Sequence, residues 1–221
     1  LYRVGQVDKR YGELLDKIFE EVRGHVPGYD TFTRLNGIII SSPGAQVYYH
    51  FDPAGQSLWQ IKGQKRVYLY PPKPPFLTEE SLEHVALYHD EVGIKYDPSF
   101  EDGAQCFQLE PGTMMHWPLN SPHRVENLDC LNISMTTEYW TEDIRRRQIV
   151  NTANGILRNM AGITPKSRAT SGLGFWSKAA MQSVVRRTGV LEKERKARRP
   201  IQFQLDKQHL GSVVELPGAA E

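Results

Sequence analysis

The first regular pattern of apolar residues lies near the start of the chain and has helical spacing. Its apolar members are Leu14, Leu15, Ile18, Phe19 and Val22. Residues three and four positions apart share one face of a helix, and Gly24 interrupts the run. The pattern predicts an amphipathic helix over residues 8–23.

From residue 35 onwards the apolar residues form short runs separated by Pro and Gly. The runs cover residues 35–40, 46–52, 57–61, 66–70, 105–109, 113–117, 123–126 and 131–137. Many short strands with such turns between them favour a mainly β fold of the jelly-roll type, a double-stranded β-helix. The segment Lys62-Gly63-Gln64 joins two of the runs and predicts a β-hairpin in which the glycine takes a positive φ.

Residues 73–103 separate the fourth run from the fifth and carry no strand pattern. Between Glu79 and Asp102 this segment contains eight acidic residues, and Lys95 is its only lysine or arginine. One interpretation is a solvated surface loop that is kept soluble by its charge. The other is a mobile lid that closes over a site and favours a substrate with a cationic group.

After Trp140 the pattern returns to helical spacing. Thr141 is a suitable N-cap, and the two acidic residues after it suit the positive end of a helix. The apolar stripe of this helix is Ile149, Ala153, Ile156, Leu157 and Met160. Gly162 is expected to end the helix, because glycine adopts the left-handed conformation of a C-cap most readily.

A second C-terminal helix is expected over residues 177–188, with a charged continuation to Arg199. The tail from Pro200 is expected to be irregular or extended. We therefore divide the chain into a jelly-roll domain, residues 1–140, and a C-terminal helical region with a tail, residues 141–221. Two helices outside a closed barrel must either cover its flank or meet a partner.

Composition limits the class of protein. The 221 residues suit one domain, or a β domain with a helical appendage, and 39% are hydrophobic. A formal charge of +1 gives no reason to expect nucleic acid or a membrane surface as partner, and no run of 18 apolar residues occurs. Cys106 and Cys130 are too few for a zinc module or a disulfide framework, and we expect both to be buried strand residues, with a single bridge between them as the alternative. The default expectation for the compartment is the cytoplasm.

Three residues have the chemistry of a metal site. His50 and Asp52 are two positions apart at the end of a strand, so both can point to one face while Phe51 points away. His123 follows later at the start of another strand. Two histidines and one carboxylate form the facial triad that holds non-haem Fe(II) in oxygenases. His116 is the rival third ligand, and three ordinary polar residues near strand ends are the simpler alternative.

Two segments resemble the cupin-like JmjC hydroxylases. They are HFDPAGQSLWQIKGQKRVYLYPP, which begins at His50, and EPGTMMHWPLNSPHRVEN, which contains His123. They are most similar to the group that contains the asparaginyl hydroxylase that inhibits hypoxia-inducible factor. The resemblance implies an enzyme, a Fe(II)- and 2-oxoglutarate-dependent dioxygenase that hydroxylates an aliphatic C–H bond. The implied substrate is a peptide or protein side chain or a small molecule.

The resemblance also implies roles for individual residues. His50, Asp52 and His123 would be the catalytic metal ligands, Lys65 would bind the distal carboxylate of 2-oxoglutarate, and Gln56 would donate a further hydrogen bond to it. The alternative for Lys65 is a solvated turn lysine, and for Gln56 a surface glutamine. Val47 departs from the pattern, since some relatives carry a threonine there. Relatives dimerise through C-terminal helices, so a homodimer is expected here.

Two alternatives from other functional classes remain at this point. One is a metal-dependent cupin that uses a divalent ion as a Lewis acid in non-oxidative chemistry. The other is a non-catalytic cupin-like binding module. Neither needs a lysine that grips a carboxylate, so the placement of Lys65 is the feature that separates them from the dioxygenase.

Overall fold

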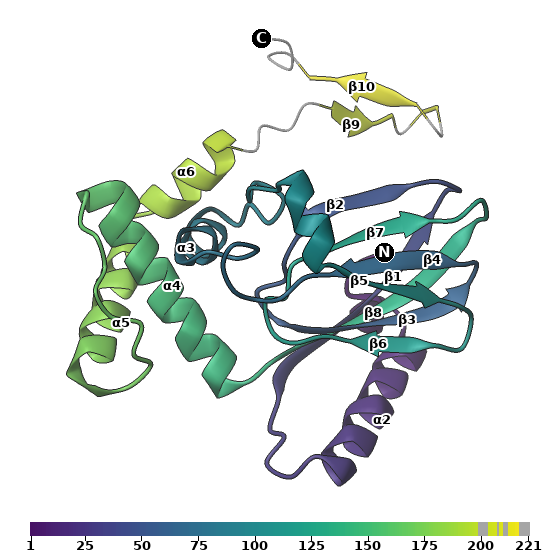
Figure 1. Ribbon diagram of the computed structural model, residues 1–221, viewed down its shortest axis with the longest axis horizontal. Helices are drawn as coiled ribbons and strands as arrows, with labels where there is room; N and C mark the ends of the chain where they lie inside the picture. Colours follow the sequence, from purple (N-terminus) through teal and green to yellow (C-terminus); the bar gives the residue numbers. More distant parts are fainter. Residues whose placement is uncertain (199–202, 207, 210–211, 217–221) are drawn as a thin grey trace.

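Two four-stranded antiparallel sheets face each other and form the barrel of the molecule (Figure 1). The computed structural model describes residues 1–198, 203–206, 208–209 and 212–216. The first sheet has the order β1 (Phe32–Ser41), β8 (Asn132–Trp140), β3 (Gly55–Lys62) and β6 (Met114–His116). The second has the order β2 (Gln46–His50), β7 (His123–Asn127), β4 (Lys65–Leu69) and β5 (Gln105–Leu109). Each expected strand is present, and the double-sheet jelly roll is confirmed.

The interior of the barrel is built from alternate residues of the facing strands. Leu58, Val67, Leu109, Trp117 and Val125 form one buried apolar cluster that joins the two sheets. Along β4, Lys65 and Val67 are buried while Arg66 between them is exposed. Since side chains alternate across a strand, Lys65 lies on the same inner face as Val67.

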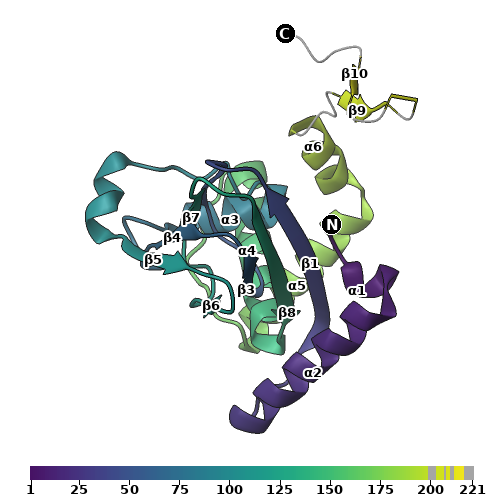
Figure 2. The same ribbon diagram turned by 90° about the vertical axis from the view of Figure 1, so that its right-hand side faces the viewer.

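The outer face of the first sheet is covered by the N-terminal helices. The short helix α1 (Val4–Val7) leads into α2 (Lys9–His25), which lies along β1 and β8 in the side view of Figure 2. The Asp8 carboxylate caps α2 by accepting a hydrogen bond from the Arg10 amide. Phe19 packs edge-on against Tyr139 of β8, with ring centroids 5.8 Å apart. The amphipathic helix expected over residues 8–23 is therefore confirmed.

The outer face of the second sheet is covered by the 73–103 segment, and the expectation of an unstructured loop is wrong. The segment contains α3 (Glu79–Tyr88) and the 3-10 helix η1 (Pro98–Gly103). Its apolar side chains join those of the sheet in one cluster, whose buried members are Tyr49, Phe51, Tyr70, Leu77, Val85, Ile94 and Phe100. Burial of apolar area holds the segment on the barrel, so it is part of the core.

The acidic residues of this segment are also not simply solvated. Glu83 is fully buried, and its carboxylate pairs with Arg158 at 2.6 Å and with Arg168 at 2.9 Å. Glu80 lies 3.5 Å from Arg158 and Glu79 lies 3.5 Å from Arg168. The C-terminal region therefore supplies the cations that the segment itself lacks, and the solvated-loop interpretation is wrong for Glu83.

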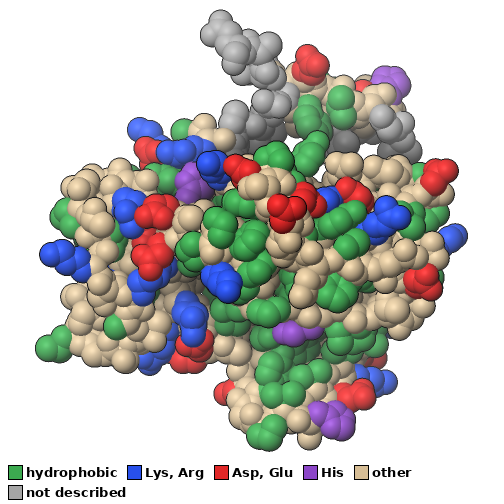
Figure 3. Space-filling model, viewed as in Figure 1, with side chains coloured by type: hydrophobic (Ala, Val, Ile, Leu, Met, Phe, Trp, Pro, Cys, Tyr) green, Lys and Arg blue, Asp and Glu red, His purple; other side chains and the backbone are tan. Residues whose placement is uncertain are grey.

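The C-terminal helices are α4 (Glu142–Ala161), α5 (Gly172–Arg187) and α6 (Val190–Arg198). The Thr141 hydroxyl caps α4 by accepting from the Ile144 amide, and Gly162 ends it with φ 67°, as expected. Helix α3 lies between the barrel and α4 (Figure 1). Its residues Leu87 and Tyr88 share a buried cluster with Ile156 of α4 and Leu191 of α6. On the face shown in Figure 3, blue and red side chains stand next to one another over these helices.

Two further details concern the ends of the chain. The second C-terminal helix begins at Gly172, earlier than the expected residue 177, and ends at Arg187. The short strands β9 (Phe203–Leu205) and β10 (Val213–Glu215) pair with each other in the tail. Arg199 and Pro200, where the charged continuation and the tail were expected to meet, lie outside the described residues. None of the helices in the described ranges has the length and apolar composition needed to cross a bilayer.

The expected hairpin at Lys62-Gly63-Gln64 is wrong. β3 pairs with β8 and β6, whereas β4 pairs with β7 and β5, so the turn carries the chain from one sheet to the other. The buried Gln60 amide holds this turn by donating to the carbonyls of Lys62 and Gly63 at 2.8 and 3.0 Å. Gly63 does take the expected positive φ, 77°.

The expectation that both cysteines are buried strand residues is also wrong. Cys106 is exposed and Cys130 is half-buried, and both are free thiols. Cys106 is on β5, the edge strand of the second sheet, where four of the five residues are exposed. Cys130 precedes β8 in a bend, so neither has the interior position that the strand pattern suggested.

Candidate metal site

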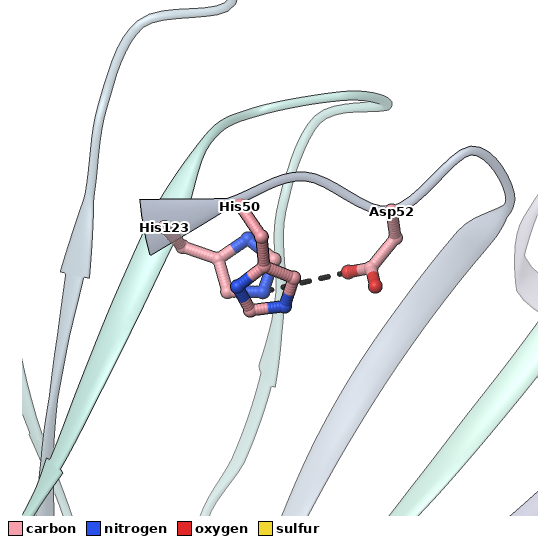
Figure 4. A group of neighbouring side chains, drawn as sticks. All are labelled: His50, Asp52 and His123. Atoms are coloured by element: carbon pink, nitrogen blue, oxygen red, sulfur yellow. Dashed lines mark ion pairs between the residues drawn. The ribbon is translucent and has the colours of Figure 1, made fainter. Parts of the chain in front are cut away.

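Two neighbouring strands bring the expected ligands together at one end of the barrel. His50 is the last residue of β2, and His123, the first residue of β7, lies directly opposite it. One ligand atom from each of His50, Asp52 and His123 lies within 4.8 Å of the other two (Figure 4). β2 ends before Asp52, so this carboxylate reaches the cluster from the start of the following loop. Asp52 and His123 are only 8% and 3% exposed.

Each ligand histidine is oriented by a backbone carbonyl two residues before it. His50 Nδ1 lies 2.8 Å from the Tyr48 carbonyl oxygen, and His123 Nδ1 lies 3.0 Å from that of Ser121. A carbonyl only accepts hydrogen bonds, so Nδ1 must carry the proton in both rings. Both Nε2 atoms then present a lone pair, which is the form that binds a metal.

The charges around His50, Asp52 and His123 favour a bound cation. Burial raises the pKa of Asp52 to about 7, and repulsion from Glu91 and Glu138 adds to this rise. Burial lowers the pKa of His123 to about 3, so its ring is neutral and its 3.5 Å contact with Asp52 Oδ2 is not an ion pair. Among the described residues, Asp52 Oδ2 has no hydrogen-bond partner although it is buried. A divalent ion would give this oxygen and the two nitrogens the positive partner they lack.

Neighbouring residues fix the ligands in place. The Asn120 amide donates a 2.8 Å hydrogen bond to the carbonyl oxygen of Asp52 and so ties the two ligand-bearing loops together. Phe51 packs in the outer apolar cluster, which turns the side chains on either side of it toward the interior. The Trp117 ring lies 4.6 Å from that of His123, between centroids. Such packing restricts the ligands to one arrangement.

His116, the rival ligand, lies elsewhere. It is exposed on β6, opposite Ser57, and its Nδ1 is 2.7 Å from the carbonyl oxygen of Gln56. Its ring stacks near Tyr139, on the outer face of the first sheet that carries α2. The group of ligand atoms around His50 therefore does not include it.

Lys65 is an interior residue rather than a solvated turn lysine. It is 3% exposed and lies four residues before Leu69, which is opposite His123 in the sheet. That separation is about 13 Å along the strand at a rise of about 3.3 Å per residue. Burial lowers the pKa of Lys65, and no described acidic side chain forms an ion pair with its ammonium. A buried, uncompensated ammonium on the same inner face as His123 is suited to an anionic ligand.

A cavity of about 940 Å³ opens beside the cluster, and Asp52 is part of its wall. Gln56, the other residue expected to bind a cosubstrate, also lines it and lies opposite Glu138 in the sheet. The structure thus places Gln56 on the first sheet and Lys65 on the second. Among the described residues, no hydrogen bond joins the Gln56 side chain to His50, Asp52 or His123.

Glu138 and Trp140 are among the residues of this cavity that sequence reasoning missed. Both line it, and the Trp140 indole donates a 3.1 Å hydrogen bond to the Glu138 carboxylate. Their spacing of two residues places them on one face of β8. The two-residue spacing can be read from the sequence. Which face of β8 the two residues share is known only from the strand register, in which Leu58 of the inner cluster lies opposite Thr136, two residues before Glu138.

Comparisons with known proteins find only distant similarity, limited to solved structures. No family model and no curated protein sequence matches the chain. Among solved structures, a DMSP lyase from Ruegeria pomeroyi DSS-3 is similar at 12% identity and a TM-score of 0.33, over 50% of this chain and 40% of that one. A cupin superfamily protein from Desulfitobacterium hafniense DCB-2 is similar at 8% identity and a TM-score of 0.31, over 51% and 72%.

An oxalate decarboxylase from Lactobacillus farciminis is similar at 13% identity and a TM-score of 0.33, over 64% of this chain. The match spans 35% of the oxalate decarboxylase and 40% of the DMSP lyase, so much of each protein has no counterpart here. The strand order of the two sheets is itself that of a jelly roll. By this strand order the chain is a jelly roll, and its cluster of two histidines and one aspartate fits a divalent metal.

Proposed function

We propose that the chain is a Fe(II)- and 2-oxoglutarate-dependent dioxygenase that hydroxylates an aliphatic C–H bond. The observation that carries this proposal is the buried ammonium of Lys65, which has no described acidic partner and lies on the inner face of the strand that pairs with His123. An ion pair with a carboxylate ligand would offset the cost of burying this charge. The resemblance of the HFD and QIKGQKR segments to JmjC hydroxylases supports the same assignment.

The residues of the proposed site have different roles. His50, Asp52 and His123 would hold Fe(II) from one side, and Lys65 would anchor the far carboxylate of 2-oxoglutarate. When bound, these two groups supply the oxidation, in which O₂ is consumed, 2-oxoglutarate becomes succinate and CO₂, and a C–H bond becomes C–OH. The apolar inner cluster that contains Val67 and Trp117 would keep water away from these groups.

The test is a titration of the Co(II)-loaded protein with 2-oxoglutarate under anaerobic conditions, followed by the optical bands of the metal. We expect the bands to change on binding, and Lys65→Ala to weaken binding by at least about tenfold, the low end for a hydrogen bond to a charged group. Lys62→Ala is the matched control, because Lys62 is three residues before Lys65 and its side chain is exposed. Unchanged binding in Lys65→Ala would remove the main support for the proposal.

A metal-dependent cupin with Lewis-acid chemistry is the second candidate, and one observation favours it. The Glu138 carboxylate lies close enough to Asp52 to raise its pKa, and a general base beside a metal suits elimination or isomerisation. Formation of succinate from 2-oxoglutarate by the Fe(II)-loaded protein separates the two. A protein that binds metal but neither binds 2-oxoglutarate nor turns it over would be a Lewis-acid cupin or a binding module.

A further inference from the structure

A pocket of about 330 Å³ lies against β2 and β7, the two strands that carry the histidines of the candidate metal site. Its other side is supplied by Val92, Ile94 and Tyr96 of the 73–103 segment. Tyr49 and Ile94 of its lining belong to the buried cluster on the outer face of the second sheet, so we call it the outer pocket. Among the described residues, none lines both this pocket and the metal-side cavity, the 940 Å³ hollow with Asp52 in its wall. The outer pocket is therefore a separate hollow, and the proposed oxidation gives it no role.

The lining of the outer pocket is mostly apolar and carries no net formal charge. Its charged members, Arg124 and Glu126, pair with each other at 2.5 Å, and Arg124 also pairs with Glu101 at 2.8 Å. The rings of Tyr49 and Tyr96, which both line the pocket, lie 5.3 Å apart between centroids. Aromatic rings pack on one another at such separations. A neutral aromatic molecule therefore suits this lining better than an ion.

Several apolar residues of the outer pocket are exposed to water. Val92 is 60% exposed and Tyr48 is 74% exposed, although both line the hollow. A ligand that covers these side chains removes apolar area from water, which favours binding. A volume of about 330 Å³ is at the lower end for small-molecule sites, so the ligand should have one or two rings.

A β-bulge connects the outer pocket with His50. The register of β2 with β7 shifts by one residue just before His50. At the shift, Tyr48 and Tyr49 together lie opposite Arg124, and such a bulge redirects the side chains around it. Tyr48 lines the pocket, and its carbonyl oxygen accepts the 2.8 Å hydrogen bond that orients the His50 ring. A ligand held against Tyr48 would therefore restrict the backbone that directs His50 toward the metal.

The 73–103 segment gives a second connection between the pocket and the metal site. His89 and Glu91 line the metal-side cavity, whereas Val92 and Ile94 line the outer pocket. Glu91 and Val92 are neighbours in the chain, so a restraint on Val92 also restrains Glu91. A ligand in the outer pocket would thus order residues that belong to the wall of the metal-side cavity.

We propose that the outer pocket binds a neutral aromatic molecule of one or two rings, and that this binding strengthens metal binding by His50, Asp52 and His123. The ligand would act by restricting the β2 bulge, because a site that is already ordered binds its metal at a lower entropic cost. Coupling between two sites is reciprocal, so the metal must strengthen binding of the aromatic molecule by the same factor. The proposal concerns binding alone and holds whichever reaction the metal performs.

The first experiment locates the ligand, with 5-fluoroindole as the probe and fluorine NMR as the measurement of binding. We expect the probe to bind, and Val92→Asn to weaken its binding by about fivefold, the effect of losing about 40 Å² of apolar contact. Val7→Asn is the matched control, because Val7 is an exposed valine of α1 that does not line the pocket. Trp140→Leu changes the wall of the metal-side cavity and should leave binding of the probe unaffected.

The second experiment measures the coupling, by calorimetric titration with Mn(II) in the presence and absence of saturating 5-fluoroindole. We expect the probe to raise the affinity for Mn(II) by about fivefold or more, the lower end for coupled sites, and Mn(II) to strengthen binding of the probe equally. Tyr48→Ala removes the ring that lines the pocket but keeps the carbonyl that orients His50. It should therefore abolish the gain in Mn(II) affinity that the probe produces.

Three results would overturn the proposal. Probe binding that is unchanged in Val92→Asn, or lost in Trp140→Leu, would place the ligand outside the outer pocket. Equal Mn(II) affinity with and without bound probe would reject the coupling. A dimer that Val92→Asn dissociates would show that a second copy of the chain fills the pocket. Failure of the metal site itself is seen separately, as probe binding that depends on Val92 in a protein that binds no Mn(II), which would retain the ligand site and reject the coupling.

Discussion

The backbone orients both histidines of the candidate metal site, and we therefore expect metal affinity to depend mainly on the proton of Asp52. The His50 and His123 rings already present unprotonated Nε2 atoms, because Nδ1 of each faces a carbonyl. The pKa of His123 is about 3, whereas that of Asp52 is about 7. Of these two ligands, only the aspartate therefore has to lose a proton for metal to bind near neutral pH.

We expect divalent metal affinity to fall by about tenfold per pH unit between about pH 7 and pH 5, as protons compete for Asp52. Below its raised pKa the carboxyl is protonated, so the loss of affinity comes as the pH decreases. Calorimetric titrations with Mn(II) at several pH values measure this slope. A slope of two decades per unit would show that a histidine also exchanges its proton.

Asp52→Ala should lower metal affinity by more than about 100-fold, since even changes to groups behind a ligand cost about 10- to 100-fold. His116→Ala is the matched control and should change little, because that ring is on the outer face of the first sheet. Equilibrium dialysis with Co(II) gives both affinities. If His116→Ala abolished binding while His123→Ala kept it, the assignment of the third ligand would be wrong.

Two turn glycines, Gly63 and Gly44, both have a positive φ but differ in the space around them. Gly63 has φ 77°, and a Cβ there would come within 2.4 Å of the Leu131 carbonyl oxygen. Gly63→Ala should cost about 2 kcal/mol or more, from the left-handed backbone together with the contact. Gly44 has φ 67° with nothing within 4 Å of a Cβ, so Gly44→Ala should cost only about 1 kcal/mol. Urea denaturation compares them, and equal costs would contradict the contact with Leu131.

All eight barrel strands could be predicted from the sequence, because alternation and Pro and Gly turns are local signals. Their partners could not, since pairing joins residues far apart, and the turn at Gly63 therefore looked like a hairpin. Helix α3 was missed although Thr78, Glu79 and Glu80 form a good helix start, because neighbouring prolines and acidic residues suggested a loop. The ligands were found from a motif, whereas Glu138 required the register of β8 with β3.

The buried carboxylate of α3 gives a further test. Glu83→Ala should lower the free energy of unfolding by about 3 kcal/mol, because Arg158 and Arg168 lose their shared partner. Glu80→Ala should cost less than about 1 kcal/mol, since the Glu80 side chain is 61% exposed. Chemical denaturation of both variants checks the difference. Similar small losses would mean that the buried pair contributes nothing net to stability.

The assembly of the chain with a second copy stays a prediction. The expected dimer surface on α4 is largely used within the chain, since Ala153 and Ile156 of its stripe are buried. Leu173 and Val184 on α5 are instead 91% and 60% exposed. We expect a homodimer through this helix, and light scattering at micromolar concentration measures it. A monomer would reject the dimer, and Val184→Glu should favour the monomer if α5 is the contact.

Helix α3 belongs to two parts of the molecule at once, and this limits how the parts can be separated. Val85 shares a buried cluster with Phe51, which lies between His50 and Asp52 in the chain, while Leu87 shares one with Ile156 of α4. A chain shortened after Trp140 would keep every barrel strand and every ligand, yet it would strip Glu83 of both arginines and uncover Leu87. The barrel and the C-terminal helices are therefore not interchangeable modules, and grafting these helices onto another jelly roll would require grafting α3 with them.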